Sequence, residues 1–287
     1  MTLTRRRFAV LCHESTTERE LRHYYITRLA EHWREDGHEV IFLFGVSTFV
    51  PADLVIVHVD LSVVPEPYLD FAQRYPVALN SQIRDIRKST FSKNLLRRDD
   101  SYGGRVIVKS DLNFGGVPER TLQAKLPRPV SLSSRVLDWY RRRRGLELES
   151  PLDYRIYENL QRVPRRIFQQ KNLVVEKFLP EIDHGLYCVR NFHFLGDRTR
   201  CVRRRAKHPI VNGSTYVDQE RVDPHPEIVA MRETMRCDYG KFDYVVVDGR
   251  AILLDVNKTV GLVRAPDTPE KQALRREQAR GIYSYLR

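Results

Sequence analysis

The chain has few of the features that mark membrane, secreted or disulfide-stabilised proteins. No run of apolar residues in its 287 residues approaches the roughly eighteen that cross a bilayer. The basic N-terminus is followed by only about five apolar residues, FAVLC, which is too short for the core of a signal peptide. The four cysteines show neither a Cys-x-x-Cys pair nor zinc-ligand spacing; they are Cys12, Cys188, Cys201 and Cys237. We therefore expect a reduced, cytoplasmic protein.

Several familiar enzyme motifs are missing too. No Gly-x-Gly-x-x-Gly appears, so dinucleotide binding has no support, and no Walker A loop is present. Gly-x-Ser-x-Gly and His-Glu-x-x-His are also absent. Cys12 and His13 follow the first predicted strand, but a cysteine in such a place more often packs in a core than acts as a nucleophile. Any chemistry must therefore come from residues scattered along the chain.

Positive charge is what the chain has in excess, with 49 Lys and Arg against 37 Asp and Glu, a net charge of +12. Nucleic acid is one partner that such a balance suggests. However, the runs TRRRF, YRRRRG and VRRRAK lack interleaved aromatic residues, and no zinc-finger or RNP-like string is present. A solvated basic surface and the binding of small phosphorylated ligands remain the other interpretations.

The first ninety residues alternate between strand and helix patterns. The apolar runs that predict strands are 7–12, 38–45, 52–60 and 76–81, and the helical patterns are 17–36 and 66–75. This order predicts an α/β, Rossmann-like parallel sheet. We place this first domain at residues 1–84.

The remainder, residues 85–287, is predicted to form a second domain. Its predicted helices are 82–97, 226–237 and 266–286. Its strand patterns are 105–109, 172–181, a hairpin over 186–206 that turns at Gly196-Asp197, and a hairpin over 241–261. Residues 117–170 are rich in Arg and Pro and give no clear pattern.

The last hairpin carries a candidate metal site. Asp255 and Asn257 point to one side of a strand, and Asp243 lies on the preceding strand. Oxygen-bearing side chains that converge in this way suit a hard cation such as Mg²⁺. A two-residue turn at Asp248-Gly249 would put Asp243 on the other side of the sheet, whereas a three-residue loop with a left-handed Gly249 would put it on the same side. The metal interpretation therefore requires a bulged loop; otherwise these are ordinary strand-edge acids.

Two further segments have the chemistry of a nucleotide site. Lys109 ends a strand and runs into a loop with Gly115 and Gly116, where backbone N–H groups can approach phosphates. A buried strand leaves through residues 176–179, where backbone groups can read a base edge, and Asp183 or Glu181 can take ribose hydroxyls. A surface loop and a polar turn are the plainer interpretations of these two segments.

Taken in order, these segments resemble the ATP-grasp superfamily, which includes D-alanine–D-alanine ligase, glutathione synthetase and the glutamate-adding peptide ligases. The resemblance covers roughly residues 80–262 and rests on five pieces in sequence. They are NSQIRDIRKSTFSKNLL, the strand lysine with its glycine loop, VVEKFLPE, the Arg-containing hairpin and KFDYVVVDGRAILLDVN.

The resemblance implies a role for each matching residue. Lys93 and Lys109 would contact the phosphates of ATP, with Lys88 as an alternative to Lys93, and Gly115 and Gly116 would form a lid loop. Glu176, Lys177, Phe178 and Leu179 would bind adenine, and Asp183 the ribose. Arg190 and one of Arg203 or Arg204 would stabilise the transferred phosphoryl group or orient the acceptor. Asp243, Asp255 and Asn257 would hold Mg²⁺.

The implied activity is ATP- and Mg²⁺-dependent ligation, in which a carboxylate becomes an acyl phosphate and an amine captures it. Small acids and amines, anionic ones among them, would be the substrates, and a homo-oligomer is common in the family. Three departures keep other functions open: Asp255 stands where the family usually has Glu, only 16 residues separate Lys93 from Lys109, and 117–170 has no counterpart. The alternatives are a kinase or a degenerate regulatory module that binds ATP, and a basic nucleic-acid-binding protein.

Overall fold

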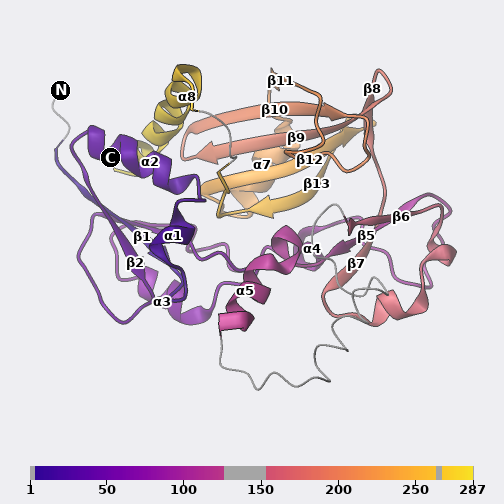
Figure 1. Cartoon of the computed structure of the whole chain (residues 1–287), viewed down its shortest axis with the longest axis horizontal. Helices are drawn as coiled ribbons and strands as arrows, with labels where there is room; N and C mark the ends of the chain where they lie inside the picture. Colours follow the sequence, from indigo (N-terminus) through magenta and orange to yellow (C-terminus); the bar gives the residue numbers. More distant parts are fainter. Residues whose placement is uncertain (1–3, 126–152, 263–266, 287) are drawn as a thin grey trace.

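The computed structural model describes residues 4–125, 153–262 and 267–286 and has the predicted α/β class (Figure 1). The strands are β1 (Arg7–Cys12), β2 (Glu39–Phe44), β3 (Leu54–Val57), β4 (Ala78–Leu79), β5 (Val106–Ser110), β6 (Arg155–Tyr157), β7 (Leu173–Lys177), β8 (Glu181–Asp183), β9 (Leu186–Leu195), β10 (Arg198–Ala206), β11 (Asp218–Val222), β12 (Tyr239–Val247) and β13 (Arg250–Asn257). The α-helices are α1 (Glu18–Leu21), α2 (Ile26–Glu35), α3 (Glu66–Ala72), α4 (Lys88–Phe91), α5 (Val117–Lys125), α7 (Pro226–Thr234) and α8 (Pro269–Ala279). The 3-10 helices are η1 (Asn113–Gly116), η3 (Leu160–Arg162), η4 (Arg165–Gln169) and η5 (Arg280–Tyr285). Of the unassigned stretch 117–170, residues 126–152, with the YRRRRG run, lie outside the described residues.

The N-terminal strands form the predicted parallel sheet, in the order β2-β1-β3-β4. Side chains of β1 alternate between the two faces. Phe8 packs with Trp33 of α2, while Ala9 packs on the other face with Phe71 of α3. Burial on both faces explains why this strand is a continuous apolar run in the sequence.

Two antiparallel sheets make up the rest of the fold. The smaller has the order β6-β5-β7, and the larger has the order β11-β10-β9-β12-β13, with β8 paired to β9. Helix α7 covers one face of the larger sheet, where Ile228 packs in a cluster with Phe192, Phe242 and Tyr244. In Figure 1 the smaller sheet lies below the larger one, and the candidate site described below uses the face of the larger sheet opposite α7.

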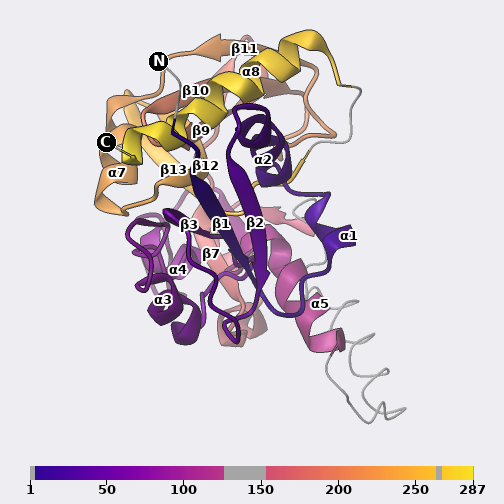
Figure 2. The same cartoon turned by 90° about the vertical axis from the view of Figure 1, so that its left-hand side faces the viewer.

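The C-terminal helix returns to the N-terminal sheet (Figure 2). The indole N–H of Trp33 in α2 donates to the carbonyl of Ala279 in α8 over 2.8 Å, and Arg276 pairs with Glu35. Gly281 follows α8 and lies against β9 so closely that a Cβ there would stand 1.9 Å from the carbonyl oxygen of Leu195. One hydrophobic cluster therefore runs from α2 through α8 to the large sheet, across the boundary predicted at residue 84.

The predicted helix over 17–36 is wrong in its middle, where α1 and α2 are separate. The backbone of residues 23–25 instead bonds to the segment after β13. Tyr25 N donates to Val260 O over 2.8 Å, and Leu262 N donates to His23 O over 2.7 Å. Local periodicity favoured one helix, but hydrogen bonds to a segment more than 200 residues away interrupt it.

The predicted helix over 82–97 is also mostly wrong, since only α4 is helical. The flanking residues reach out to three other parts of the chain. Ile86 N donates to Ser62 O, Lys88 N to Asp111 O and Leu96 N to Val175 O. This segment therefore ties the N-terminal sheet to β5 and β7, and its helical spacing in the sequence reflects scattered contacts rather than one helix face.

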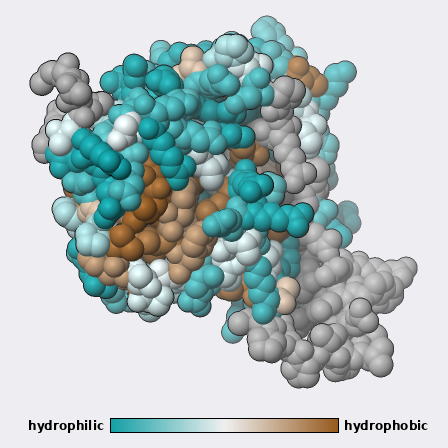
Figure 3. Space-filling view, turned by 60° about the vertical axis from the view of Figure 1, so that its left-hand side comes forward, coloured by the Kyte–Doolittle hydropathy of each residue, from teal (hydrophilic) through white to brown (hydrophobic). Residues whose placement is uncertain are grey.

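Hydrophilic side chains cover most of the face seen in Figure 3, and apolar residues gather in one part of it. Among the described residues the large apolar side chains with the most exposure are Phe114, Ile182, Tyr216 and Val217. The described helices include none that is long and apolar enough to cross a membrane.

Asn80 joins the parallel sheet to the large antiparallel sheet. It is fully buried, and its φ of 58° lies in the left-handed region that Asn tolerates. Its side-chain oxygen accepts from the backbone N–H groups of Asp238 and Tyr239, at 2.9 and 3.1 Å, and its amide donates to Tyr239 O over 2.8 Å. One side chain therefore satisfies three backbone groups at the start of β12.

We predict that Asn80→Ala lowers the free energy of unfolding by about 3 kcal/mol, because it leaves buried backbone groups without partners. Urea denaturation followed by circular dichroism measures this. Ser81→Ala is the matched control, since Ser81 makes only a turn bond to Ala78 O. Equal, small losses in both variants would contradict the role given to Asn80.

Candidate nucleotide and acceptor site

Two adjoining cavities lie against the face of the large sheet opposite α7. The one we call the hinge cavity, of about 330 Å³, lies between that face and β5 and includes residues 177–180. The other, the junction cavity of about 550 Å³, lies between the same face, the loops after β1 and β3, and α5. Residues that line both are Asn113, Phe114, Arg204, Lys241 and Asn257. A ligand that fills the hinge cavity therefore ends beside whatever occupies the junction cavity.

The three predicted metal ligands do lie on one face, but not for the predicted reason. The loop is a two-residue turn, with φ of 51° at Asp248 and 73° at Gly249 and with Val247 opposite Arg250, so the predicted three-residue loop is wrong. The register shifts further along. Tyr244 pairs with Leu253 and Asp243 with Asp255, which leaves Leu254 as an extra residue in β13. This bulge brings Asp243 and Asp255 directly opposite each other.

Lysines neutralise both carboxylates. Lys241 Nζ is 2.8 Å from Asp243, and Lys88 Nζ is 2.9 Å from Asp255. Burial alone would lower the pKa of Lys88, but Asp255 beside it raises that pKa overall. The side chain of Lys88 is 2% exposed, so its charge is held in place for the carboxylate and for any phosphate in the hinge cavity.

The residues around these carboxylates fit a hard cation. Asn191 Nδ2 donates to Asp243 over 2.5 Å, while Asn191 Oδ1 is buried without a partner. Asn257 Oδ1 also lies nearby and accepts from Thr259 N over 2.9 Å. Two carboxylates and two amide oxygens form the all-oxygen set that Mg²⁺ prefers. No group of three or more His, Cys, Asp or Glu gathers among the described residues, so the set depends on the amides.

The predicted phosphate lysines have different positions. Lys109 is buried, lines the hinge cavity and pairs with Glu176 over 2.7 Å. Lys93 is exposed and lines neither cavity, whereas Lys88, the alternative, lines the hinge cavity. Of the three lysines considered for phosphate binding, the fold therefore brings Lys88 and Lys109 together in the hinge cavity.

The glycine loop is a strained turn at the mouth of the hinge cavity. Phe114, Gly115 and Gly116 have φ values of 45°, 66° and 76° in succession. The positive φ suits glycine, and a Cβ at Gly116 would stand 2.9 Å from Leu112 Cδ1. Phe114 carries the strain and is 58% exposed while lining both cavities. Gly115 and Gly116 themselves are buried and line neither cavity, so their contact with a ligand stays a prediction.

Residues 176–179 form one end of the hinge cavity. Phe178 and Leu179 line it, while Glu176 is buried behind them with its Oε1 unpaired. The N–H groups of Lys177 and Phe178 already donate to Asn94 and Arg105 carbonyls at 2.9 Å. The next N–H along the chain, that of Leu179, is the first one past these two hydrogen bonds.

Tyr154, which the sequence did not single out, also lines this cavity, and burial raises the pKa of its hydroxyl to about 12.

The predicted arginines lie on opposite faces of the large sheet. Arg204 lines both cavities. Arg190 and Arg203 face the other side, where they pair with Glu181 at 2.8 Å and with Asp183 at 3.1 Å, respectively. Asp183, predicted to bind ribose, also pairs with Arg205, whose hydrogen bond lowers the pKa of Asp183. Neither Arg190, Arg203 nor Asp183 lines a cavity, and their contact with a ligand stays a prediction.

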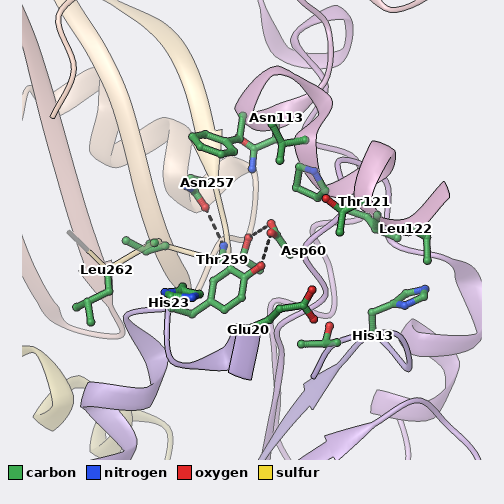
Figure 4. A pocket seen from close by; sticks show the side chains of 18 of the residues that line it. His13, Glu20, His23, Asp60, Asn113, Thr121, Leu122, Asn257, Thr259 and Leu262 are labelled. Atoms are coloured by element: carbon green, nitrogen blue, oxygen red, sulfur yellow. Dashed lines mark hydrogen bonds between the residues drawn. The ribbon is translucent and has the colours of Figure 1, made fainter. Parts of the chain in front are cut away.

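The floor of the junction cavity carries polar groups that sequence reasoning missed (Figure 4). Asp60 accepts from the Tyr24 hydroxyl over 2.6 Å and from Thr259 Oγ1 over 2.5 Å. Lys258, which precedes Thr259 and lines neither cavity, is fully buried; it donates to Leu61 O over 2.5 Å, and burial lowers its pKa to about 8. The only signal in the sequence is that Asp60 ends an apolar strand. Its partners come from 36 and 199 residues away, so no local pattern reveals them.

A scan against models of protein families found no match, and no curated protein matches the chain. Solved structures do match. D-alanine–D-alanine ligase from Bacillus anthracis gives a TM-score of 0.51 at 10% identity, over 99% of this chain and 96% of that one. A macrocyclase from Microcystis aeruginosa, solved with its precursor peptide, gives 0.50 at 11% identity, over 95% and 99%. These likenesses establish the fold: the chain shares the fold of these two enzymes, in agreement with the fold that the resemblance to the ATP-grasp superfamily implied.

The buried His58, whose ring contacts Tyr24 of the junction cavity, predicts a pH dependence of stability. His58 is 2% exposed, its Nε2 has no partner, and burial lowers its pKa from 6.5 to about 3. The folded chain therefore keeps His58 neutral, while the unfolded chain protonates it below about pH 6.5. The stability is complete above that pH and is lost as the pH falls from about 6.5 toward 3.

We predict that His58→Phe, which keeps a ring against Tyr24, removes about 2 kcal/mol of the stability loss between pH 7 and pH 5. Urea denaturation at both pH values measures the difference. His184→Gln, at a side chain that is 91% exposed, should leave the loss unchanged. Parallel pH profiles for wild type and His58→Phe would show that His58 does not titrate on unfolding.

Proposed function

We propose that the chain is an ATP-dependent carboxylate–amine ligase. The observation that carries this is the continuity of the two cavities. One end of the hinge cavity is suited to a base, its middle carries Lys88 and Lys109, and its far end opens at Arg204 and Lys241 into the junction cavity. A transferable phosphoryl group at that opening would meet a substrate held in the junction cavity. The ATP-grasp fold supports this arrangement.

Each part of the nucleotide would have a partner. Adenine would lie against Phe178 and Leu179, with the Leu179 N–H as a donor to the ring. Lys88 and Lys109 would bind the phosphates, and Asp243, Asp255 and Asn257, with Asn191, would hold Mg²⁺ between them. Bound there, Mg²⁺ would neutralise phosphate charge and align the terminal phosphoryl group.

Lys88 would have two partners in turn. Without nucleotide it neutralises Asp255 at 2.9 Å. With Asp255 engaged in holding a cation, the ammonium group of Lys88 would be free to bind a phosphate oxygen in the same cavity. A buried lysine keeps its charge only with a partner close by, so this exchange keeps the group paired in both states.

The chemistry would take place at the opening between the cavities. A substrate carboxylate oxygen attacks the terminal phosphorus, the bond to ADP breaks, and an acyl phosphate forms. An amine nitrogen then attacks the acyl carbon, phosphate leaves, and an amide results. Arg204 and Lys241 would stabilise the charge that develops on the transferred group, and the Phe114–Gly116 loop would keep water away from the acyl phosphate. No covalent nucleophile of the protein is needed.

The first test is nucleotide binding by calorimetry with β,γ-methylene-ATP. We expect binding that requires Mg²⁺ and that weakens by at least about 100-fold in the Asp255→Ala, Asn257→Ala double variant, since even residues that only orient metal ligands cost up to that much. Asp248→Asn, in the exposed turn of the same hairpin, should bind as wild type does. A wild-type protein that binds no nucleotide under any condition would rule out the ligase.

The second test distinguishes the role of Arg204 from that of Arg203. The protein is incubated with MgATP, a panel of carboxylic acids and hydroxylamine, which traps acyl phosphates as coloured hydroxamates. Arg204→Gln should lower the rate by about 100-fold or more while the affinity for the ATP analogue changes little. Arg203→Gln, one residue along on the other face, should retain most of the rate. Hydrolysis of ATP without hydroxamate from any acid would favour the kinase or regulatory alternative.

A further inference from the structure

Resting on the proposed function, we propose that the acceptor acid carries a second anionic group, a carboxylate or a phosphate. Arg200, Arg204 and Arg221 would bind this group on the cavity face of the large sheet. The substrate class would therefore be acids with at least two anionic groups.

Arginines on the two faces of β10 and β11 have different partners. On the α7 side, Arg190, Arg203 and Arg205 are paired with four acids, at distances from 2.5 to 3.8 Å; these acids are Glu181, Asp183, Asp218 and Glu220. On the cavity side, the register places Arg200, Arg204 and Arg221 among Val202, His193 and Gln219. Among the described residues no carboxylate pairs with any of these three arginines.

The three arginines are neighbours. Arg200 and Arg204 stand on either side of Val202 along β10, and Arg221 is directly opposite Val202 on β11. Arg221 is therefore diagonal to both, at about 7–8 Å between backbones, which long side chains span easily. Three guanidinium groups can converge on one anion from this triangle, and each offers the planar fork that fits a carboxylate or phosphate.

The surroundings of Arg200 show that positive charge there is uncompensated. Burial has the largest effect on the pKa of Arg200 and lowers it. The next largest effects come from the Tyr25 hydroxyl, from Arg204 and Arg221, and from the Cys201 thiol, and the net result is a lowered pKa. Like charges crowded in a partly buried place oppose folding unless an anion joins them.

The nucleotide is not that anion. The proposed phosphate ligands Lys88 and Lys109 line the hinge cavity, whereas Arg200 and Arg221 line neither cavity. Asp243 on β12 and Val202 on β10 are two strands apart, about 10 Å, and Arg221 is one strand further. Arg204 lies between, at the opening where the reacting carboxylate would sit, so it would contact both anions, whereas Arg200 and Arg221 would contact only the second. The second anionic group would therefore lie several ångströms from the reacting carboxylate, at the other end of the same acceptor molecule.

The test compares matched acids in calorimetric titrations of the full chain saturated with Mg²⁺ and β,γ-methylene-ATP. The probes are straight-chain monocarboxylates and α,ω-dicarboxylates of equal length, from four to seven carbons. At the best length, the dicarboxylate should bind at least about tenfold more tightly than its monocarboxylate. Arg221→Gln should remove this preference. Arg205→Gln, which removes the same charge from the opposite face, should retain it.

A phosphonate probe distinguishes the two sources of charge. Stronger binding of 3-phosphonopropionate than of succinate, which has the same two-methylene spacer, would assign the second group as phosphoryl, and the reverse as carboxyl. Diacids that bind no better than monoacids at every length, or a preference that survives Arg221→Gln, would overturn the proposal. A single-stranded oligonucleotide that displaces the best diacid at lower concentration would also overturn it and assign the arginines to nucleic acid.

The same titrations separate this inference from the proposed function. Nucleotide binding is measured first, on the same samples. If the analogue fails to bind, the ligase proposal fails, and the diacid series on the nucleotide-free protein still tests the three arginines. If the analogue binds and the diacids show no preference, only the second anion site is lost. Circular dichroism of Arg221→Gln and Arg205→Gln confirms that both variants fold.

Discussion

One extra residue in β13 decides the geometry of the candidate site. Leu254 has no partner in the ladder between Leu253, which pairs with Tyr244, and Asp255, which pairs with Asp243. Without this bulge, Leu254 would pair with Asp243, and the tight turn at Asp248-Gly249 would put the two carboxylates on opposite faces, because side chains alternate along a strand. With it, Asp243, Asp255 and Asn191 share a row, Lys88 can reach Asp255, and the cavities open on the same face.

The large sheet then works as a partition between two electrostatic environments. Its α7 side ties arginines to acids in pairs, Arg190 with Glu181 and Arg205 with Asp183 among them, which holds the exposed strands β8 and β11 in place. Its cavity side keeps Arg204 and Lys241 at the meeting point of two cavities. A net charge of +12 is therefore not spread evenly; part of it is concentrated where an anion would react.

The junction cavity exists because distant segments are tied together beneath it. Residues 23–25 bond to residues 260–262, Asp60 bonds to Tyr24 and Thr259, and Ser62 bonds to Asn113 through its hydroxyl. The parallel sheet, the glycine loop and the exit of β13 thus share one polar junction.

The sequence by itself determined the α/β order, the parallel first sheet, both long hairpins and the identity of several cavity residues. The order, the sheet and the hairpins follow from local rules, namely apolar runs for strands buried on both faces and turn residues at 196–197 and 248–249. The cavity residues were implied by the resemblance to the ATP-grasp superfamily. Tertiary structure alone decided what depends on partners far along the chain. It interrupted the helix at residues 22–25, placed the bulge at Leu254 and chose Lys88 over Lys93 for the cavity. It also separated Arg204 from Arg203, because only the register of the assembled sheet fixes which side of a strand faces a ligand.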